Sequence, residues 1–358
     1  MVGTLSSFLA LFLFLCGPLM AAPASQITRI ATMTAARAKH TATLLYDGTV
    51  LIAGGVGNDG NVLASAEVYD PVGQKFAPTG SMNQARAGHS AVRLVNGTVL
   101  IIGGLGPAGA LDSCEIYDPK ARKFLPAAHL HSPRAAATAT GLQDNRVLVV
   151  GGYGSDGVSM ASAEIYDRNS TFSPAGVMSA PRSFHTATLL PHERVLITGG
   201  KQGNESLNSA EIYAAELNRF LPLPNMIVAR DRHAAVSLLD GSVLILGGEN
   251  GHNQQGIATT ETLDAENKKF RESASMGKPR KDSANPVVFP SGDVLIVGGA
   301  RTAEVYDPVT KAFSVASGTL ERSRWFQSAT LLSDGKVLIL GGADDKGRAT
   351  AQAWIYNF

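Results

Sequence analysis

The sequence predicts an all-β protein built from seven copies of one unit of four short antiparallel strands. The first observation is a series of seven glycine pairs at spacings near 48 residues. The second is that each pair closes an apolar run rich in Val, Leu and Ile, which is typical of a strand buried on both faces. The pairs lie at 54–55, 103–104, 151–152, 199–200, 247–248, 298–299 and 341–342. Because one such sheet cannot bury both of its faces alone, the copies must stack on one another.

The first unit shows how each element is recognised. An apolar strand begins at His40 (HTATLL), and the turn YDGT separates it from the buried strand VLIA, which ends at Gly54 and Gly55. A loop that varies between units follows, then a third strand, AEVYD, and a fourth strand marked by Phe76. Aromatic residues mark the fourth strand of the next five units at Phe124, Phe172, Phe220, Phe270 and Phe313.

This pattern resembles the kelch family, in which an apolar strand ends in Gly-Gly, the third strand carries Tyr and the fourth an aromatic residue, with a period of about 50 residues. The resemblance covers Gln26 to Phe358. Two departures are that Phe takes the place of the usual Trp in the fourth strand and that Leu263 replaces Tyr in the fifth unit. The resemblance implies a seven-bladed β-propeller of four-stranded blades around a central channel, and the exported, bacterial type of kelch protein.

The chain ends before a fourth strand can follow the seventh unit. The missing strand is supplied by the other end, because QITRIATM (26–33) aligns with QKFAPTGSM (74–82). We therefore expect the N-terminal strand to pair into the last blade, which closes the ring and protects edges that an open array would expose.

The N-terminus reads as a secretory signal peptide over residues 1–24, followed by a single propeller domain over 25–358. The apolar run FLALFLFLC (8–16) is short for a membrane span, and Ala22-Pro23-Ala24 offers small residues for cleavage. No Lys or Arg precedes the run, and an uncleaved anchor is the alternative. We expect a secreted or periplasmic monomer with no transmembrane span after removal of the signal.

Composition excludes several classes of function. The formal net charge of +1 provides no basic field for nucleic acid. No paired-Cys metal spacing occurs, and after signal removal Cys114 is the only cysteine, in an apolar strand pattern that indicates a buried, inert thiol. The glycine pairs end strands and do not begin helices, so they are not phosphate loops. We expect no cofactor and no metal, and nothing marks the copper site of the galactose oxidases, which also contain kelch-like propellers.

Repeated charged residues flank the first and third strands on one face of the disc, which we call the Arg/loop face. In kelch adaptor proteins arginines at this position contact the partner, so the resemblance suggests this face for binding. The structural alternative, which we favour for most of the ring, is an Arg–Glu ladder that ties blades together. The ladder residues are Arg37, Arg86, Arg134, Arg182 and Arg230 with Glu67, Glu115, Glu164, Glu211, Glu261 and Glu304.

Histidines recur three residues after four of these arginines, at His40, His89, His185 and His233. The other three blades have Ala137, Ser283 and Gln327 there, and a ring of guanidinium charge repels a cation. Hydrogen bonding between blades is therefore favoured over metal binding.

The irregular region between blades 6 and 7 is the candidate ligand site. The loop after the sixth glycine pair is only Ala300–Ala303, and Trp354 stands where the seventh blade lacks its Glu. Two views compete: a notch with an aromatic platform, or tryptophans that only pack the closing blade. The ligand-binding candidates are Arg280, Arg301, Arg324, Trp325, Trp354 and, in the loop after the fifth glycine pair, His252.

These observations favour a non-catalytic binding propeller that recognises a glycan or a protein partner on the Arg/loop face. The alternative is an enzyme acting on sugars, an epimerase or an oxidase, because exported kelch propellers include both. An acid–base pair at the channel mouth would favour the enzyme, and a flat aromatic rim would favour binding.

Overall fold

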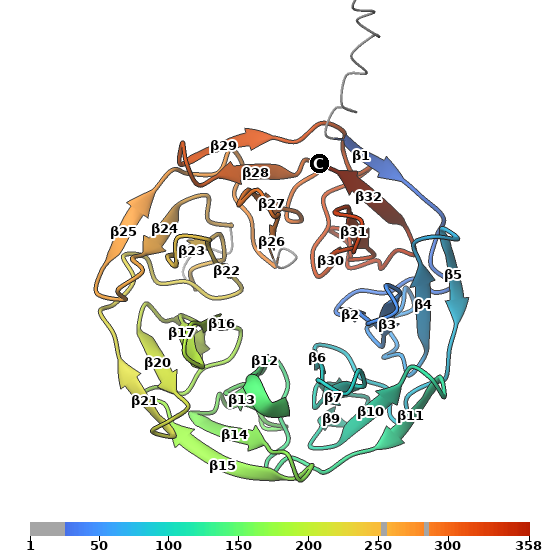
Figure 1. Cartoon of the computed structure of the whole chain (residues 1–358), viewed down its shortest axis with the longest axis horizontal. Coiled ribbons are helices and arrows are strands. Elements are labelled where there is room, and N and C mark those ends of the chain that lie inside the picture. The colour runs from blue at the N-terminus through green and yellow to red at the C-terminus, as the bar shows by residue number, and fades with distance from the viewer. Residues whose placement is uncertain (1–25, 252–255, 283–285) are drawn as a thin grey trace, which may run out of the picture.

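The computed structural model describes residues 26–251, 256–282 and 286–358. Seven four-stranded antiparallel sheets stand side by side around a central opening, which confirms the seven-bladed β-propeller (Figure 1). The signal peptide expected over residues 1–24 and the candidate His252 lie outside the described residues.

Each blade runs outward from the channel in chain order, apart from the outermost strand of blade 7. From the inside outward the strands are β2 (Thr41–Leu44), β3 (Val50–Ala53), β4 (Ala66–Asp70) and β5 (Lys75–Pro78) in blade 1; β6 (Ser90–Arg93), β7 (Val99–Ile102), β10 (Cys114–Asp118) and β11 (Lys123–Pro126) in blade 2; β12 (Thr138–Gly141), β13 (Val147–Val150), β14 (Ser162–Tyr166) and β15 (Phe172–Val177) in blade 3; β16 (Thr186–Leu190), β17 (Arg194–Thr198), β20 (Ala210–Ala214) and β21 (Arg219–Pro222) in blade 4; β22 (Ala234–Ser237), β23 (Val243–Leu246), β24 (Thr260–Leu263) and β25 (Phe270–Ser273) in blade 5; β26 (Val287–Val288), β27 (Val294–Ile296), β28 (Glu304–Asp307) and β29 (Ala312–Val315) in blade 6; and β30 (Ser328–Leu331), β31 (Val337–Leu340), β32 (Ala353–Asn357) and β1 (Gln26–Arg29) in blade 7.

Two short hairpins and a 3-10 turn lie in the connections between these strands. The loops after the glycine pairs of blades 2 and 4 form the hairpins β8–β9 (Leu105–Gly106, Gly109–Ala110) and β18–β19 (Lys201–Gln202, Glu205–Ser206). A 3-10 turn, Gln143–Asn145, connects β12 to β13.

The N-terminal strand closes the ring as the sequence predicts. β1 pairs antiparallel with β32, from Gln26 opposite Asn357 to Arg29 opposite Trp354. The Ile27 amide also donates to the carbonyl of Ser317 in blade 6, at 3.0 Å. The two ends of the chain therefore share one sheet and contact the preceding blade.

The core lies between blades. The second strands are buried along their length, apart from the half-buried Arg194 at the start of β17, and their side chains meet those of the neighbouring blade. In one such cluster, Leu51 and Val68 of blade 1 pack with Val99, Ile101 and Tyr117 of blade 2. The continuous apolar runs of the sequence are explained by this packing, because each second strand is covered by a blade on both sides.

The glycine pairs allow the backbone to turn where blades meet. Gly54 has a φ of +64°, and a Cβ there would clash with the carbonyl oxygen of Arg86 in the next blade. An L residue is disfavoured by both the conformation and the space.

Candidate functional site

The repeat arginines are buried against the repeat glutamates in blades 1 to 6. In blade 1, Arg37 is fully buried, its Nη2 lies 2.9 Å from Glu67 Oε1, and its Nη1 donates to the carbonyl of Gly54 at 2.7 Å. The same contact recurs at 2.8 to 3.0 Å in the pairs Arg86–Glu115, Arg134–Glu164, Arg182–Glu211, Arg230–Glu261 and Arg280–Glu304. Each side-chain pair lies within one blade. It holds the segment that precedes the first strand against the third strand.

The main chain of the same arginine reaches the preceding blade. The amide of Gly55 in blade 1 donates to the carbonyl of Arg86 in blade 2 at 2.9 Å, and Gly342 of blade 7 donates to Arg37 of blade 1 at 3.0 Å. One residue thus joins two blades, by its carbonyl to one and by its guanidinium to the next.

The expected notch between blades 6 and 7 is filled by packed side chains. Arg280 is 0% exposed in its pair with Glu304, and Trp354 is 2% exposed among the apolar residues of blades 6 and 7. The expectation that these two side chains face an opening is therefore not met in this structure. Trp325 is half-buried and Arg301 is exposed.

Arg324 differs from the other six repeat arginines because Trp354 replaces its glutamate. It is 5% exposed, donates from Nη2 to Gln352 Oε1 at 2.9 Å, and lies with its guanidinium carbon 6.0 Å from the Trp354 ring centre. Gln352 in turn donates to Glu321 at 2.7 Å.

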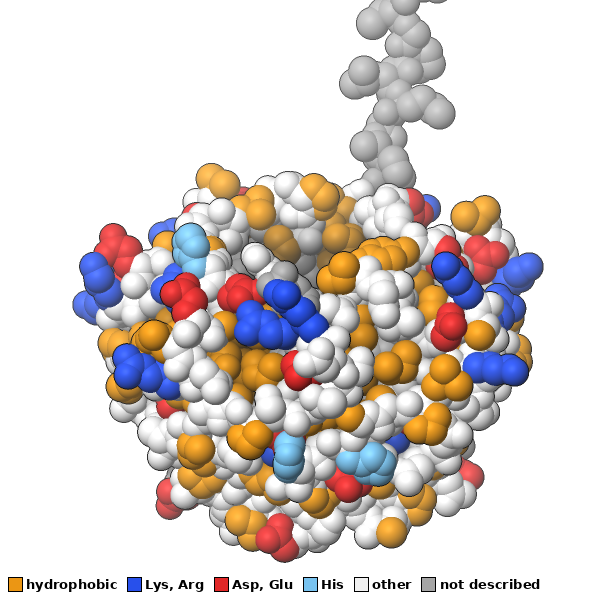
Figure 2. Space-filling view, turned by 60° about the horizontal axis from the view of Figure 1, so that its bottom comes forward, with side chains coloured by type: hydrophobic (Ala, Val, Ile, Leu, Met, Phe, Trp, Pro, Cys, Tyr) orange, Lys and Arg blue, Asp and Glu red, His pale blue; other side chains and the backbone are white. Residues whose placement is uncertain are grey.

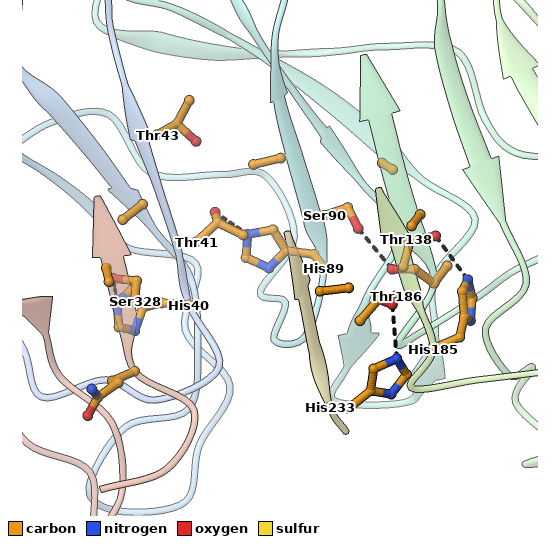
Figure 3. Close-up of a pocket in the computed structure, with 18 residues that line it drawn as sticks. His40, Thr41, Thr43, His89, Ser90, Thr138, His185, Thr186, His233 and Ser328 are labelled. Carbon is orange, nitrogen blue, oxygen red and sulfur yellow. Dashed lines mark hydrogen bonds between the residues drawn. The ribbon is translucent and has the colours of Figure 1, made fainter. Parts of the chain in front are cut away.

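The four repeat histidines connect neighbouring blades by hydrogen bonds. His89 Nε2 lies 2.9 Å from Thr41 Oγ1 of the preceding blade, and His40 Nε2 lies 2.9 Å from Ser328 Oγ across the closing seam (Figure 3). His185 and His233 make the same contacts with Thr138 and Thr186. The hydrogen bonds between blades that the sequence predicts for these histidines are therefore confirmed.

Burial lowers the pKa of the His40, His89 and His185 imidazoles to about 3 and holds that of His233 well below its usual value. Repulsion by the adjacent repeat arginines acts in the same direction. The imidazoles are therefore neutral at physiological pH. Among residues 26–251, 256–282 and 286–358, no group of three or more His, Cys, Asp or Glu side chains is arranged to hold a metal ion.

The channel is a cavity of about 570 Å³ lined by these imidazoles, small side chains and hydroxyls, including Thr43 and Ser90 (Figure 3). None of its lining residues carries a formal charge at neutral pH. The charged side chains that could select a ligand lie instead where the channel opens on the Arg/loop face.

Seven residues with positive φ surround that opening, one from each blade and each two positions after the repeat arginine. Each amide donates to the carbonyl of its counterpart in the preceding blade, at 2.9 to 3.4 Å, so that the hydrogen bonds form a closed ring. We call these residues the mouth ring: Lys39, Gly88, Ala136, Phe184, Arg232, Asp282 and Phe326. Left-handed conformations at six non-glycine residues are costly and need support from surrounding structure, which the ring supplies.

The mouth is a second cavity, of about 440 Å³, with two different walls. Blades 1 to 3 contribute the first residue after each glycine pair, namely Val56, Leu105 and Tyr153, together with alanines of the mouth. The equivalent residues in blades 4 and 5 are Lys201 and Glu249. The charged residues that line the cavity itself are Arg232 and Asp282 of blades 5 and 6, which form a charged half, and Lys39 of blade 1, beside the apolar half.

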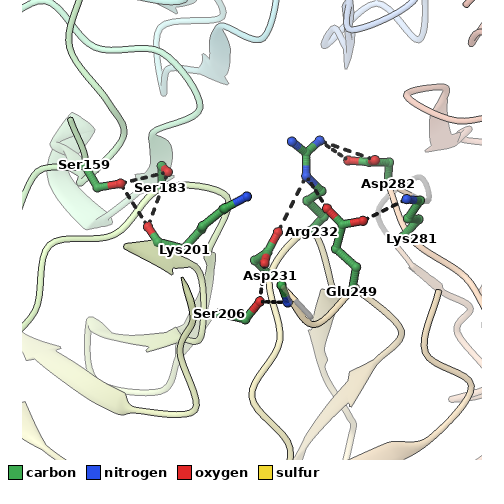
Figure 4. Close-up of polar contacts among 10 residues, drawn as sticks. Ser159, Ser183, Lys201, Ser206, Asp231, Arg232, Glu249, Lys281 and Asp282 are labelled. Atoms are coloured by element: carbon green, nitrogen blue, oxygen red, sulfur yellow. Dashed lines mark hydrogen bonds and ion pairs between the residues drawn. The ribbon is translucent and has the colours of Figure 1, made fainter. Parts of the chain in front are cut away.

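Arg232 is the centre of the charged half (Figure 4). Its Nε lies 3.0 Å from Glu249 Oε1 and 3.6 Å from Asp231 Oδ1, and its Nη1 lies 3.2 Å from Asp282 Oδ1. Glu249 also pairs with Lys281 at 2.8 Å. Burial raises the pKa of Asp282 to about 6 and raises that of Asp231, although Arg232 opposes both shifts.

The aromatic rings of the mouth are partly covered by cations. The guanidinium carbon of Arg232 lies 4.2 Å from the Phe184 ring centre, and Lys39 Nζ lies 4.6 Å from that of Phe326. Tyr153 packs against Phe184 with their ring centres 5.8 Å apart.

The sequence contained a signal for this mouth that reasoning from the repeats missed. The repeat arginine and the glycine pair are the same in all seven blades. The positions that carry the signal lie next to them: the two residues after each arginine and the one residue after each glycine pair. The position directly after the repeat arginine is small in blades 1 to 4 (Ala38, Ala87, Ala135 and Ser183). It is charged in blades 5 and 6, where the residues are Asp231 and Lys281. A comparison of the seven units at those positions would have separated the charged half from the apolar half.

The surface shown in Figure 2 mixes basic, acidic and hydrophobic side chains, without an extended area of one charge. Across the described ranges, no helix has the length and hydropathy needed to cross a membrane.

Comparison with known proteins supports the architecture. The kelch motif is matched at residues 37–83 and 85–130, which are the first two repeats. A solved structure described as a novel fungal alcohol oxidase of the AA5 family, in complex with copper, superposes with a TM-score of 0.75 over 92% of this chain and 75% of that chain, at 15% identity. At that identity the likeness concerns the fold alone. No curated protein matches the sequence. With the motif matched in two repeats and the same four-stranded unit completing all seven blades, the chain is a kelch-repeat β-propeller.

Proposed function

We propose that this propeller is an exported, non-catalytic binding protein whose ligand, a glycan or a protein partner, sits in the channel mouth on the Arg/loop face. The observation that carries the proposal is the two-sided mouth. Its side chains occupy positions that the repeat leaves free to vary, whereas the repeat arginines and glutamates of blades 1 to 6 form buried ion pairs with each other. Concave sites with apolar walls and a few placed polar groups are the usual form of a binding site.

The mouth can be tested separately from the rest of the disc. Tyr153→Ala and Asp282→Asn alter the apolar and charged halves, and Tyr46→Ala, at a side chain 64% exposed in a turn on the opposite face, is the control. The chain lacking residues 1–24 is screened against a glycan array and a peptide display library. Binding that weakens about ten-fold in both mouth variants and not in the control supports the proposal. Binding that no mouth variant changes would refute it.

One observation favours the second candidate, an enzyme acting on sugars. Asp282 lines the mouth, and a carboxyl group with a pKa of about 6 exchanges protons near neutral pH. An epimerase needs such a group, and turnover would disappear in Asp282→Asn while folding is kept. A screen of small sugars for epimerisation and oxidation, with this variant as control, separates the enzyme from the binding protein.

A further inference from the structure

The apolar half of the mouth contains a gap above Gly88. A Cβ built on Gly88 meets no atom within 4 Å, so the space above it is open. Every other mouth-ring residue carries a side chain, and the ring is therefore indented at this blade.

Two aliphatic side chains lie on either side of this gap. Leu105 pairs through both backbone groups with Ala87, the residue before Gly88, and Val56 pairs in the same way with Ala38, the residue before Lys39. The amide of Gly88 donates to the carbonyl of Lys39 at 2.9 Å, which brings the two pairs together. Leu105 is 38% exposed and lines the mouth cavity, so part of its side chain is open to a ligand.

Lys39 places a positive charge next to the aliphatic walls. Its ammonium lies over Phe326, and although Asp282 attracts it, no ion pair among the described residues includes it. The carboxylates of the charged half are already engaged by Arg232 and Lys281. The charge left for a ligand beside Gly88 is therefore positive, and its complement is a carboxylate.

We infer that the mouth binds a polypeptide segment that inserts an aliphatic side chain over Gly88 and places a neighbouring carboxylate, from an acidic residue or a chain end, on Lys39. This deepens the proposed function and rests on it. A sugar fits less well, because its apolar face prefers an open aromatic ring, whereas cations lie over Phe184 and Phe326, and Tyr153 packs against Phe184. An aliphatic group instead gains from contact with Val56 and Leu105.

The test begins with selection from a peptide display library on the chain lacking residues 1–24. The enriched peptides should carry Leu, Ile or Val next to Asp, Glu or a free C-terminus. The affinity of the best synthetic peptide is then measured for Gly88→Asn, which fills the gap with a residue that tolerates positive φ, and for Leu105→Asp and Lys39→Gln. Each should weaken binding about ten-fold or more.

Leu125→Asp is the matched control, since Leu125 belongs to the same blade and is 52% exposed on its outer strand. Melting curves of all four variants show whether each is folded. Peptide binding that depends on Tyr153 and Asp282 but is unchanged in Gly88→Asn overturns this inference and leaves the proposed function standing. Mouth-dependent glycan binding without peptide binding does the same. Failure of every peptide and glycan to bind at the mouth overturns both.

Discussion

The amide of Lys39 donates to the carbonyl of Phe326 at 3.0 Å, and the Lys39 ammonium lies 4.6 Å from the centre of the Phe326 ring. Phe326 precedes the first strand of blade 7 and Lys39 that of blade 1, so this contact closes the mouth ring across the seam between the two ends of the chain. The ring and the β1–β32 pairing are separate connections at the same seam, one at the channel and one at the rim.

The ring predicts an unequal response to two substitutions of Gly88. Its φ is +56°, and no neighbour would touch a new Cβ, so the cost of Gly88→Ala comes from the backbone alone. We expect Gly88→Ala to lower the free energy of unfolding by about 1 to 2 kcal/mol. Gly88→Asn should cost less, because Asn enters the left-handed region more easily. Urea unfolding of both variants measures the difference, and equal losses would show that the strain is not conformational.

A second prediction concerns the closing strand. β1 pairs along its whole length with β32, and Ile27 is buried in the cluster between blades 6 and 7. Loss of β1 leaves β32 as an exposed edge and opens that cluster. A chain that begins at Thr34 should therefore melt at a lower temperature than one that begins at Ser25, in a single cooperative transition. Coincident melting curves would show that the seam does not depend on β1.

The repeats predicted the architecture because every blade needs the same turn at its glycine pair and the same buried second strand. Gly54 and Gly55 must turn sharply beside the next blade, and Val50 to Ala53 must be buried on both faces, so residue type and spacing report position directly. The mouth follows another rule. Arg232, Asp282 and Lys39 come from three blades, and the residue type at their shared position differs from blade to blade, so only the closed ring shows which side chains come together.

The sequence left two views of the region between blades 6 and 7 open for a related reason. A short loop in sequence does not report what fills the space above it, and the large Trp354 side chain fills the position of the missing glutamate. In the same blade pair, β26 has only two residues, an irregularity that the spacing of the repeats did not reveal.

A third prediction follows from the neutral imidazoles. The unfolded chain binds protons at these histidines near pH 6.5, whereas the folded values for His40, His89 and His185 are about 3. Between these limits the unfolded state holds more protons, so the contribution of these groups is fully present above pH 6.5 and is lost as the pH falls toward 3. The slope approaches about 1.4 kcal/mol per pH unit for each histidine.

Urea unfolding between pH 7 and pH 4 measures this slope. His89→Gln should reduce it, because Gln327 shows that an amide fits the equivalent position in blade 7. An unaltered slope in His89→Gln would mean that other groups set the acid sensitivity.

The last prediction decides the role of Trp354. Its side chain is 2% exposed and packs with Ile27, Val337 and Ile339, residues of the closing blade. Trp354→Ala removes a large apolar side chain and leaves Arg324 beside a cavity. We expect a loss of about 3 to 5 kcal/mol, the usual cost of such a truncation. Trp325→Ala, at the half-buried tryptophan of the same blade, is the comparison and should cost less, because less apolar surface is withdrawn from water there. If Trp354→Ala leaves the unfolding curve in place, Trp354 does not pack the seam, and the ligand-binding interpretation of this side chain regains support.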